Sequence, residues 1–256
     1  MSDLYDSIKK GRNLMKADWS DFKDLKTDQR KKVEHPAVVK PYDNSKLIDL
    51  PEPLRTDRIV SDINELIQSR RSHRKFTNEK MSLTELSYLL HSTQRIQKLV
   101  KKDTATLRPV PSAGAKHPYE TYLAILNIEE LKKGIYRYLP DVHKLLYLHT
   151  YRDLKKRINL SVNDQKFTTK SNVVFYWSCI PYRSEWRYSI KSHKAMLLDA
   201  GHICQNLYLA AESMKFGTCA IAAYDQELSD QLLKLDGEDE FTVYISPVGK
   251  QEKIEI

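Results

Sequence analysis

RRSHRKF at residues 70–76 and PVPSAGAKHPYE at residues 109–120 are the two most informative stretches of this chain. The first combines several cations with the hydroxyl of Ser72, a set that suits a phosphate group. The second bends through Ser112, Ala113 and Gly114, whose small side chains let the backbone lie against a flat ligand. Together the two stretches suggest a bound nucleotide.

The length and composition fit an ordinary enzyme. A chain of 256 residues with 41% hydrophobic residues can bury a sizeable core in one main domain with extensions. The sequence has no apolar run of about eighteen residues, and Met1–Tyr5 lacks the apolar region of a signal peptide. We therefore expect a cytoplasmic protein with no membrane partner.

The charged residues and cysteines point to no macromolecular partner or metal. The net charge is +8, but the 42 basic residues are scattered among 34 acidic ones, and no nucleic-acid motif accompanies them. We expect no nucleic acid to bind. The basic residues are interpreted first as solvated surface, and binding of an anionic small ligand is the next possibility. Cys179, Cys204 and Cys219 lack metal-type spacing and are expected to be buried, reduced thiols.

The chain divides into an extension and a main body. Residues 1–55 contain two short helical candidates followed by a proline-rich stretch, and we expect them to wrap over the body or over a partner subunit. Residues 56–256 form the body. In it, helices are expected at 61–70, capped by Ser61 or Asp62, and at 82–93, where Ser82 and Glu85 make a capping box.

The second half of the body alternates strands with further helices. Strands are expected at 120–126, 134–139 and 145–148 as an antiparallel unit, and residues 173–180 read as a central strand buried on both faces. A long helix over 191–215 is ended by Gly217. A strand at 218–224, a helix at 226–235 and a strand at 241–248 complete the predicted elements.

The order of these motifs resembles the nitroreductase superfamily of flavin enzymes, and looks closest to its SagB-type branch of azoline dehydrogenases. The resemblance rests on residues 70–76, 108–120, 134–138, 199–207, 217–224 and 248–249. It implies an α+β sandwich with a central, mainly antiparallel sheet flanked by helices. It also implies a long helix at the interface of a homodimer, and FMN bound between the subunits.

The resemblance assigns cofactor roles to residues in four segments. Arg70, Arg71 and Ser72 match phosphate and ribityl contacts, and Arg74 matches a cation near the flavin pyrimidine that would stabilise the reduced anion. Backbone contacts to the ring are implied for the loop and for the segment before the last helix, and phosphate contacts for the end of the last strand: Pro111, Ser112, Ala113, Gly114, Ile221, Ala222, Ala223, Gly249 and Lys250. Without the resemblance, a solvated helix end, an ordinary loop and an exposed lysine explain the same residues.

Arg187 and Tyr188 occupy the place where azoline dehydrogenases carry a Lys-Tyr pair associated with proton removal. A lysine can act as a base, but an arginine stays protonated, so the role would pass to Tyr188 alone or be lost. Tyr188 is equally explained as a packing aromatic.

Two histidines and one glycine complete the candidates. His117 and His202 lack metal-ligand spacing, which favours structural roles. Gly201 lies inside the long predicted helix, where glycine costs about 1 kcal/mol relative to alanine. It therefore suggests a close neighbour, either another part of the chain or a second subunit.

The functional prediction is an FMN-dependent oxidoreductase that takes hydride from NAD(P)H and passes it through flavin N5 to a small organic acceptor. A SagB-type dehydrogenase acting on azoline rings of a peptide, and a flavin-binding subunit without turnover, are the alternatives.

Overall fold

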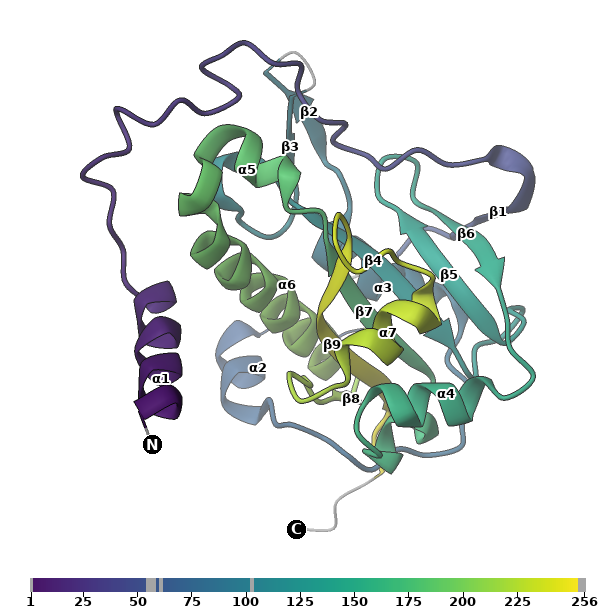
Figure 1. Ribbon diagram of the computed structural model, residues 1–256. Coiled ribbons are helices and arrows are strands. Elements are labelled where there is room, and N and C mark those ends of the chain that lie inside the picture. The colour runs from purple at the N-terminus through teal and green to yellow at the C-terminus, as the bar shows by residue number, and fades with distance from the viewer. Residues whose placement is uncertain (1, 54–58, 60–61, 102–103, 253–256) are drawn as a thin grey trace.

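One seven-stranded antiparallel sheet organises the molecule, in the order β1-β6-β5-β4-β7-β9-β8 (Figure 1). The computed structural model describes residues 2–53, 59, 62–101 and 104–252. The strands of the sheet are β1 (Leu47–Asp49), β4 (Tyr119–Ile125), β5 (Gly134–Leu139), β6 (Lys144–His149), β7 (Val173–Cys179), β8 (Phe216–Thr218) and β9 (Phe241–Lys250). A separate hairpin pairs β2 (Lys98–Val100) with β3 (Ala105–Leu107).

Helices cover both faces of the sheet. The core on one face packs α3 (Leu83–Gln94) and α6 (His193–Ser213) against the strands, and the core on the other packs α4 (Leu154–Ser161) and α7 (Gln226–Leu233) (Figure 1). All seven residues of β7 are buried, as the near-continuous apolar run predicts for a strand covered on both sides. The α+β sandwich expected from the sequence is confirmed.

The predicted helix starts are confirmed in their capping chemistry. The Asp62 side chain accepts hydrogen bonds from the backbone N–H groups of Asn64 and Glu65 at the start of α2 (Ile63–Ser69). Ser82 and Glu85 form the expected capping box at the start of α3. The first backbone N–H groups of a helix have no partner within the helix, and at the starts of α2 and α3 these side chains accept their hydrogen bonds.

Two expectations near the long helix are wrong. The α-helix begins at His193, after α5 (Tyr182–Tyr188) and a 3-10 turn (Ser189–Ser192), and it ends at Ser213, so Gly217 is not its stop. Gly217 instead lies in β8, where a β-carbon would come within 2.5 Å of the His73 side chain. The predicted strand at 218–224 shrinks to the end of β8 and a single bridge at Ile221, because this segment leaves the sheet edge.

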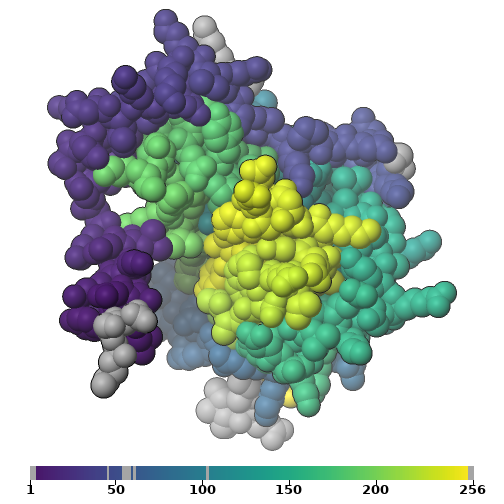
Figure 2. All heavy atoms as spheres, viewed as in Figure 1, coloured from purple at the N-terminus to yellow at the C-terminus, as the bar shows by residue number. Residues whose placement is uncertain are grey.

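Within its described residues, the N-terminal segment contains one α-helix, α1 (Ser2–Met15), rather than two. It is followed by turns and by an extended stretch that reaches the sheet, where β1 pairs with β6. In Figure 2 the purple and blue atoms of this segment lie along the green atoms of α5. The expected boundary between residues 55 and 56 lies outside the described residues.

The extended stretch is fastened to the body by backbone carbonyls. The Trp186 indole N–H donates to the Val33 carbonyl at 3.0 Å, and Arg183 donates to the Ala37 carbonyl at 3.0 Å. Arg137 donates to the Pro41 carbonyl at 2.8 Å. Residues 33–49 are therefore part of the folded body rather than a separate arm.

Short 3-10 turns at Asn44–Lys46, Ala113–Ala115 and Lys166–Lys170 complete the elements of the described residues. Cys179, Cys204 and Cys219 are buried and free, as expected. Among the described helices, none combines the length and apolarity that crossing a membrane requires.

Candidate functional site

The segment after α2 is extended, not helical. Arg70 leaves the helix with φ −49° and ψ 124°, Ser72 bridges to Thr218, and His73 N–H donates to the Thr218 carbonyl at 2.9 Å. Because side chains alternate along an extended chain, residues 70, 72 and 74 share one side. Arg70 and Arg74 thus come to the same side through a period of two residues, not through a continued helix.

Tyr208 on α6 receives this side of the segment. The Arg70 guanidinium lies 5.1 Å from the Tyr208 ring centroid, and the Ser72 hydroxyl lies 3.0 Å from the Tyr208 hydroxyl. The Ala220 N–H donates to the same Tyr208 hydroxyl at 2.8 Å. Tyr208 therefore joins the basic segment to residues 219–223, and we call Arg70, Ser72, Arg74, Tyr208 and Ala220 the basic cluster.

The guanidinium groups of the segment are open to solvent or to a ligand. In the described part of the chain, Arg70, Arg71 and Arg74 have no carboxylate partner. Arg74 lies 5.9 Å from the ring of Phe167, and Arg71 folds back onto the Gln68 carbonyl at 2.6 Å. Cations without acidic partners beside a hydroxyl are a donor set that fits a phosphate.

The neighbouring backbone offers unused donors. Ile221 pairs with Ile245 of β9, after which Ala222 and Ala223 lie exposed. Within the described residues the N–H groups of Ala222 and Ala223 have no hydrogen-bond acceptor. Small side chains leave this backbone accessible to a flat ring, so the segment fits the edge of a flavin.

The loop at 111–114 is held by Asp199 of α6. The Ser112 hydroxyl donates to the Asp199 carboxylate at 2.5 Å, and the Ala113 N–H donates to it at 3.2 Å. Burial raises the Asp199 pKa, while these two donors oppose the rise. The sequence predicted that this loop contacts a ligand, yet the Ser112 hydroxyl and the Ala113 N–H already donate hydrogen bonds within the chain.

Gly114 and Tyr188 lie in close contact. Gly114 has φ +64°, and a β-carbon there would come within 2.5 Å of the Tyr188 hydroxyl, so only glycine fits. Trp19 and Phe22 cover the Tyr188 ring with centroid distances of 5.8 Å and 6.0 Å. The Arg187 guanidinium lies 5.2 Å from the same ring. Tyr188 therefore meets the predicted loop, and Arg187 contacts the Tyr188 ring.

Gly249 and Lys250 lie apart from the basic cluster in their contacts. Gly249 is packed under Phe76, whose ring would meet an added β-carbon at 2.9 Å. The Lys250 ammonium lies 3.6 Å from Glu79 and 5.8 Å from the Phe216 ring. Their predicted phosphate role stays a prediction.

The structure thus sorts the predicted residues into two groups along α6. Tyr208 holds the basic cluster and Asp199 holds the loop, nine positions earlier, which corresponds to about 14 Å of helix. Sequence reasoning missed both residues as anchors. Asp199 was visible as a carboxylate at a buried helical position, whereas nothing local to Tyr208 reveals that its hydroxyl would meet Ser72.

Comparison with known proteins identifies the family of this chain. Residues 67–250 match the family described as "Nitroreductase family". The chain is 26% identical over 190 residues to "Putative nitroreductase MJ1384" of Methanocaldococcus jannaschii, covering 74% of this chain and 91% of that protein. The protein therefore belongs to the nitroreductase family of oxidoreductases.

One further relative supports the SagB-like branch, and one solved structure shows the same fold. The microcin B17-processing protein McbC of Escherichia coli is 26% identical over 133 residues, which are 50% of this chain and about half (49%) of McbC. The solved E. coli microcin synthetase McbBCD complex, with truncated pro-MccB17 bound, shares the fold with a TM-score of 0.60 and 22% identity, over 79% of each chain.

Proposed function

We propose that this protein is an FMN-dependent oxidoreductase that uses NAD(P)H to reduce a small organic acceptor. The observation that carries the proposal is the basic cluster, whose guanidinium groups have no carboxylate partner in the described chain and which Tyr208 joins, through Ala220, to the segment with the N–H groups of Ala222 and Ala223. When bound, the flavin would supply hydride transfer between donor and acceptor. Overall, NAD(P)H, a proton and the acceptor give NAD(P)+ and the acceptor reduced by two electrons.

Within this proposal, Arg70 and Ser72 hold the phosphate, while Arg74 lies on the side of the ring. A guanidinium binds phosphate oxygens through paired N–H donors, and the Ser72 hydroxyl adds another. Tyr208 fixes the position of Ser72 from α6. The segment can bind a dianion without first breaking an ion pair within the described chain.

Residues 219–223 would line the ring. Burial raises the pKa of the Cys219 thiol, which therefore stays protonated and neutral at pH 7. The exposed backbone of Ala222 and Ala223 would donate hydrogen bonds to the edge of the ring. Arg74 provides positive charge on this side, which favours a reduced, anionic ring.

We also propose a homodimer that forms through the outer side of α6. A β-carbon added at Gly201 would meet nothing within 4 Å, so packing within the described chain does not explain this glycine. Leu197 and Leu198 are 51% and 56% exposed on the preceding turn. A second subunit would bury these leucines and approach the helix closely at Gly201.

The absorption spectrum of freshly purified protein tests the proposal. We expect a flavin spectrum, release of FMN on denaturation at about one per chain, and bleaching by NADH or NADPH without oxygen. A colourless protein that fails to take up added FMN would contradict the proposal. Flavin that stays oxidised with both NADH and NADPH would contradict the proposal that NAD(P)H is the hydride donor.

Peptide azoline oxidation is the second candidate, favoured by the likeness to McbC and by the contact of Tyr188 with Gly114. Arg187 stays protonated, so Tyr188 would be the group that moves a proton. Tyr188→Phe is expected to lower turnover of an azoline peptide by about 100-fold while FMN binding is retained. Unchanged turnover would show that Tyr188 only packs.

A further inference from the structure

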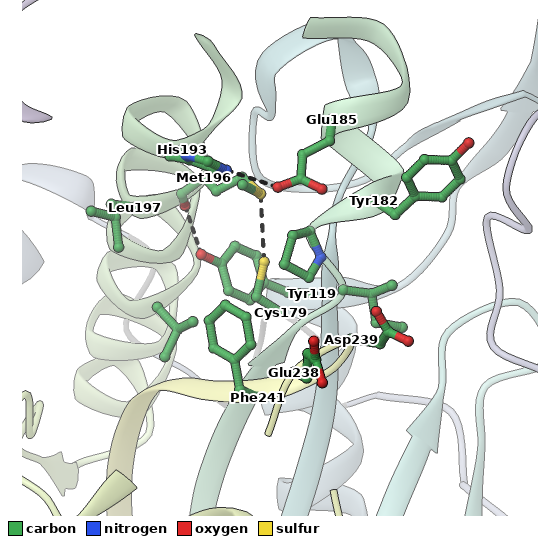
Figure 3. Close-up of a pocket in the computed structure, with 13 residues that line it drawn as sticks. Tyr119, Cys179, Tyr182, Glu185, His193, Met196, Leu197, Glu238, Asp239 and Phe241 are labelled. Carbon is green, nitrogen blue, oxygen red and sulfur yellow. Dashed lines mark hydrogen bonds and ion pairs between the residues drawn. The ribbon is translucent and has the colours of Figure 1, made fainter. Parts of the chain in front are cut away.

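A cavity of about 660 Å³ lies between α5, the start of α6, the end of β7 and the start of β9 (Figure 3). Its wall includes Tyr119, Cys179, Met196, Phe241 and Val243. None of these residues belongs to the basic cluster or to the loop at 111–114. The volume suits a molecule built around one or two rings.

The cavity adjoins both groups of predicted site residues. Val243 is two residues from Ile245, which pairs with Ile221 at the start of the exposed backbone segment. Met196 lies one turn before Asp199, the anchor of the loop. A molecule in the cavity would therefore lie next to the proposed ring site.

The inner wall is apolar because its polar atoms are already bonded. The Tyr119 hydroxyl donates to the Met196 carbonyl at 2.8 Å, and the Cys179 thiol lies 3.6 Å from the Met196 sulfur. Burial raises the pKa of Cys179 to about 12, so this thiol stays neutral. Figure 3 shows the rings of Tyr119 and Phe241 among the residues that line the cavity.

The rim is acidic. Figure 3 shows Glu185 and His193 at one side and Glu238 and Asp239 at the other, and no lysine or arginine is part of the wall. Glu185 and His193 lie 2.8 Å apart, which leaves the carboxylates of Glu238 and Asp239, both on exposed residues, without a cation in the wall.

This acidity is unusual in a chain of net charge +8. Another cavity of the described structure contains Lys40, Lys46, Arg137 and Lys234 in its wall, and a third contains Lys16, Lys191 and Lys194. The charged side chains in the wall of the first cavity are therefore acidic, whereas those of the other two cavities are mainly basic. This difference in charge favours a cationic ligand in the first cavity.

We propose that this cavity is the acceptor site and selects an apolar, ring-sized molecule that carries a positive charge. This inference rests on the proposed oxidoreductase function. The apolar body packs between Tyr119, Met196 and Phe241, and the cation faces Glu238 and Asp239. The reducible group then points toward residues 221–223.

Three acceptors of matched shape test the selection: 4-nitrobenzylammonium, 4-nitrobenzyl alcohol and 4-nitrobenzoate. Each nitro group takes two electrons and two protons from NAD(P)H and H+ to give a nitroso group and water. We expect kcat/KM without oxygen to be about tenfold higher for the ammonium compound than for the benzoate, with the neutral alcohol between them.

The double variant Glu238→Gln, Asp239→Asn is expected to reduce that preference about fivefold through KM. Glu129→Gln, Glu130→Gln is the matched control, because Glu129 and Glu130 are an adjacent, exposed acidic pair outside the cavity wall. An equal loss in both variants, or no preference in the wild type, would overturn the proposal.

Calorimetric titration of the same three compounds into the FMN-reconstituted protein separates this proposal from the proposed function. Charge-ordered binding without turnover would support the cavity and contradict the reductase function. Turnover combined with binding that ignores charge would contradict the cavity assignment alone.

Discussion

Two sets of arginines show how the same side chain serves structure in one region and remains open in another. Arg137 and Arg183 are 4% and 2% exposed. Arg183 donates to Glu120 at 2.7 Å and to the Ala37 carbonyl, and Arg137 donates to the Pro41 carbonyl. Arg70 and Arg74, by contrast, contact aromatic rings and have no carboxylate partner in the described chain.

The difference teaches which cations a ligand can use. A buried guanidinium has lost its hydration, so its partners within the chain must stay in place. An exposed guanidinium without a partner keeps its donors for a phosphate at little structural cost. Substitution should therefore affect stability in the first set and ligand affinity in the second.

The largest expected effect is at Arg183. Arg183→Met leaves the Glu120 carboxylate buried at 4% exposure with no cation, and should lower the free energy of unfolding by about 3–5 kcal/mol. Urea denaturation measures the loss. Adding Glu120→Gln should restore much of it, because the uncompensated charge is removed. A loss under 1 kcal/mol in the single variant would show that the pair is not structural.

A smaller effect concerns pH and His117, which lies near another buried arginine, Arg108. Burial, and secondly the Arg108 cation, lower the pKa of His117 to about 3. Below pH 6.5 the unfolded chain takes up a proton that the folded chain refuses, so stability falls as pH falls. His117→Asn tolerates φ 45° and should reduce the loss between pH 7.5 and 5 by about 2 kcal/mol.

Thermal unfolding at the two pH values measures this change. Parallel profiles for His117→Asn and the wild type would contradict the burial of a neutral histidine.

The smallest effect lies at Ser189, in the connection between α5 and α6. The buried Arg183 belongs to α5, and α6 anchors the basic cluster. Ser189 has φ 49° and ψ −139°, a conformation that favours glycine. Ser189→Gly should stabilise the fold by about 1 kcal/mol and raise Tm by about 2–4 °C. Ser189→Ala keeps the β-carbon and should bring no gain. A gain in both variants would assign the effect to the hydroxyl.

The sequence predicted most of the fold because its signals were local. The capping box at Ser82 and Glu85 and the apolar run of β7 each depend on neighbouring residues, and both are confirmed. The end of the long helix was misplaced because Gly217 is a glycine for a tertiary reason, the close approach of His73. Such an approach cannot be seen in the residues on either side.

The candidate site was predictable in composition but not in arrangement. The cations at 70–74 were found, yet their common side depends on an extended chain paired with Thr218, a residue far along the sequence. The acidic cavity was missed because its wall joins β4, β7, α5, α6 and β9. Only the folded sheet brings those residues together.

Titration of FMN into flavin-free protein tests the central claim most directly. The double variant Arg70→Ala, Arg74→Ala should bind FMN about 10- to 100-fold more weakly, because a phosphate donor and a cation beside the ring are lost, while flavin-free stability stays unchanged. Arg152→Ala, at another exposed arginine, should bind FMN like the wild type. Equal FMN affinity in the double variant and the wild type would contradict the assignment of the basic cluster to the phosphate.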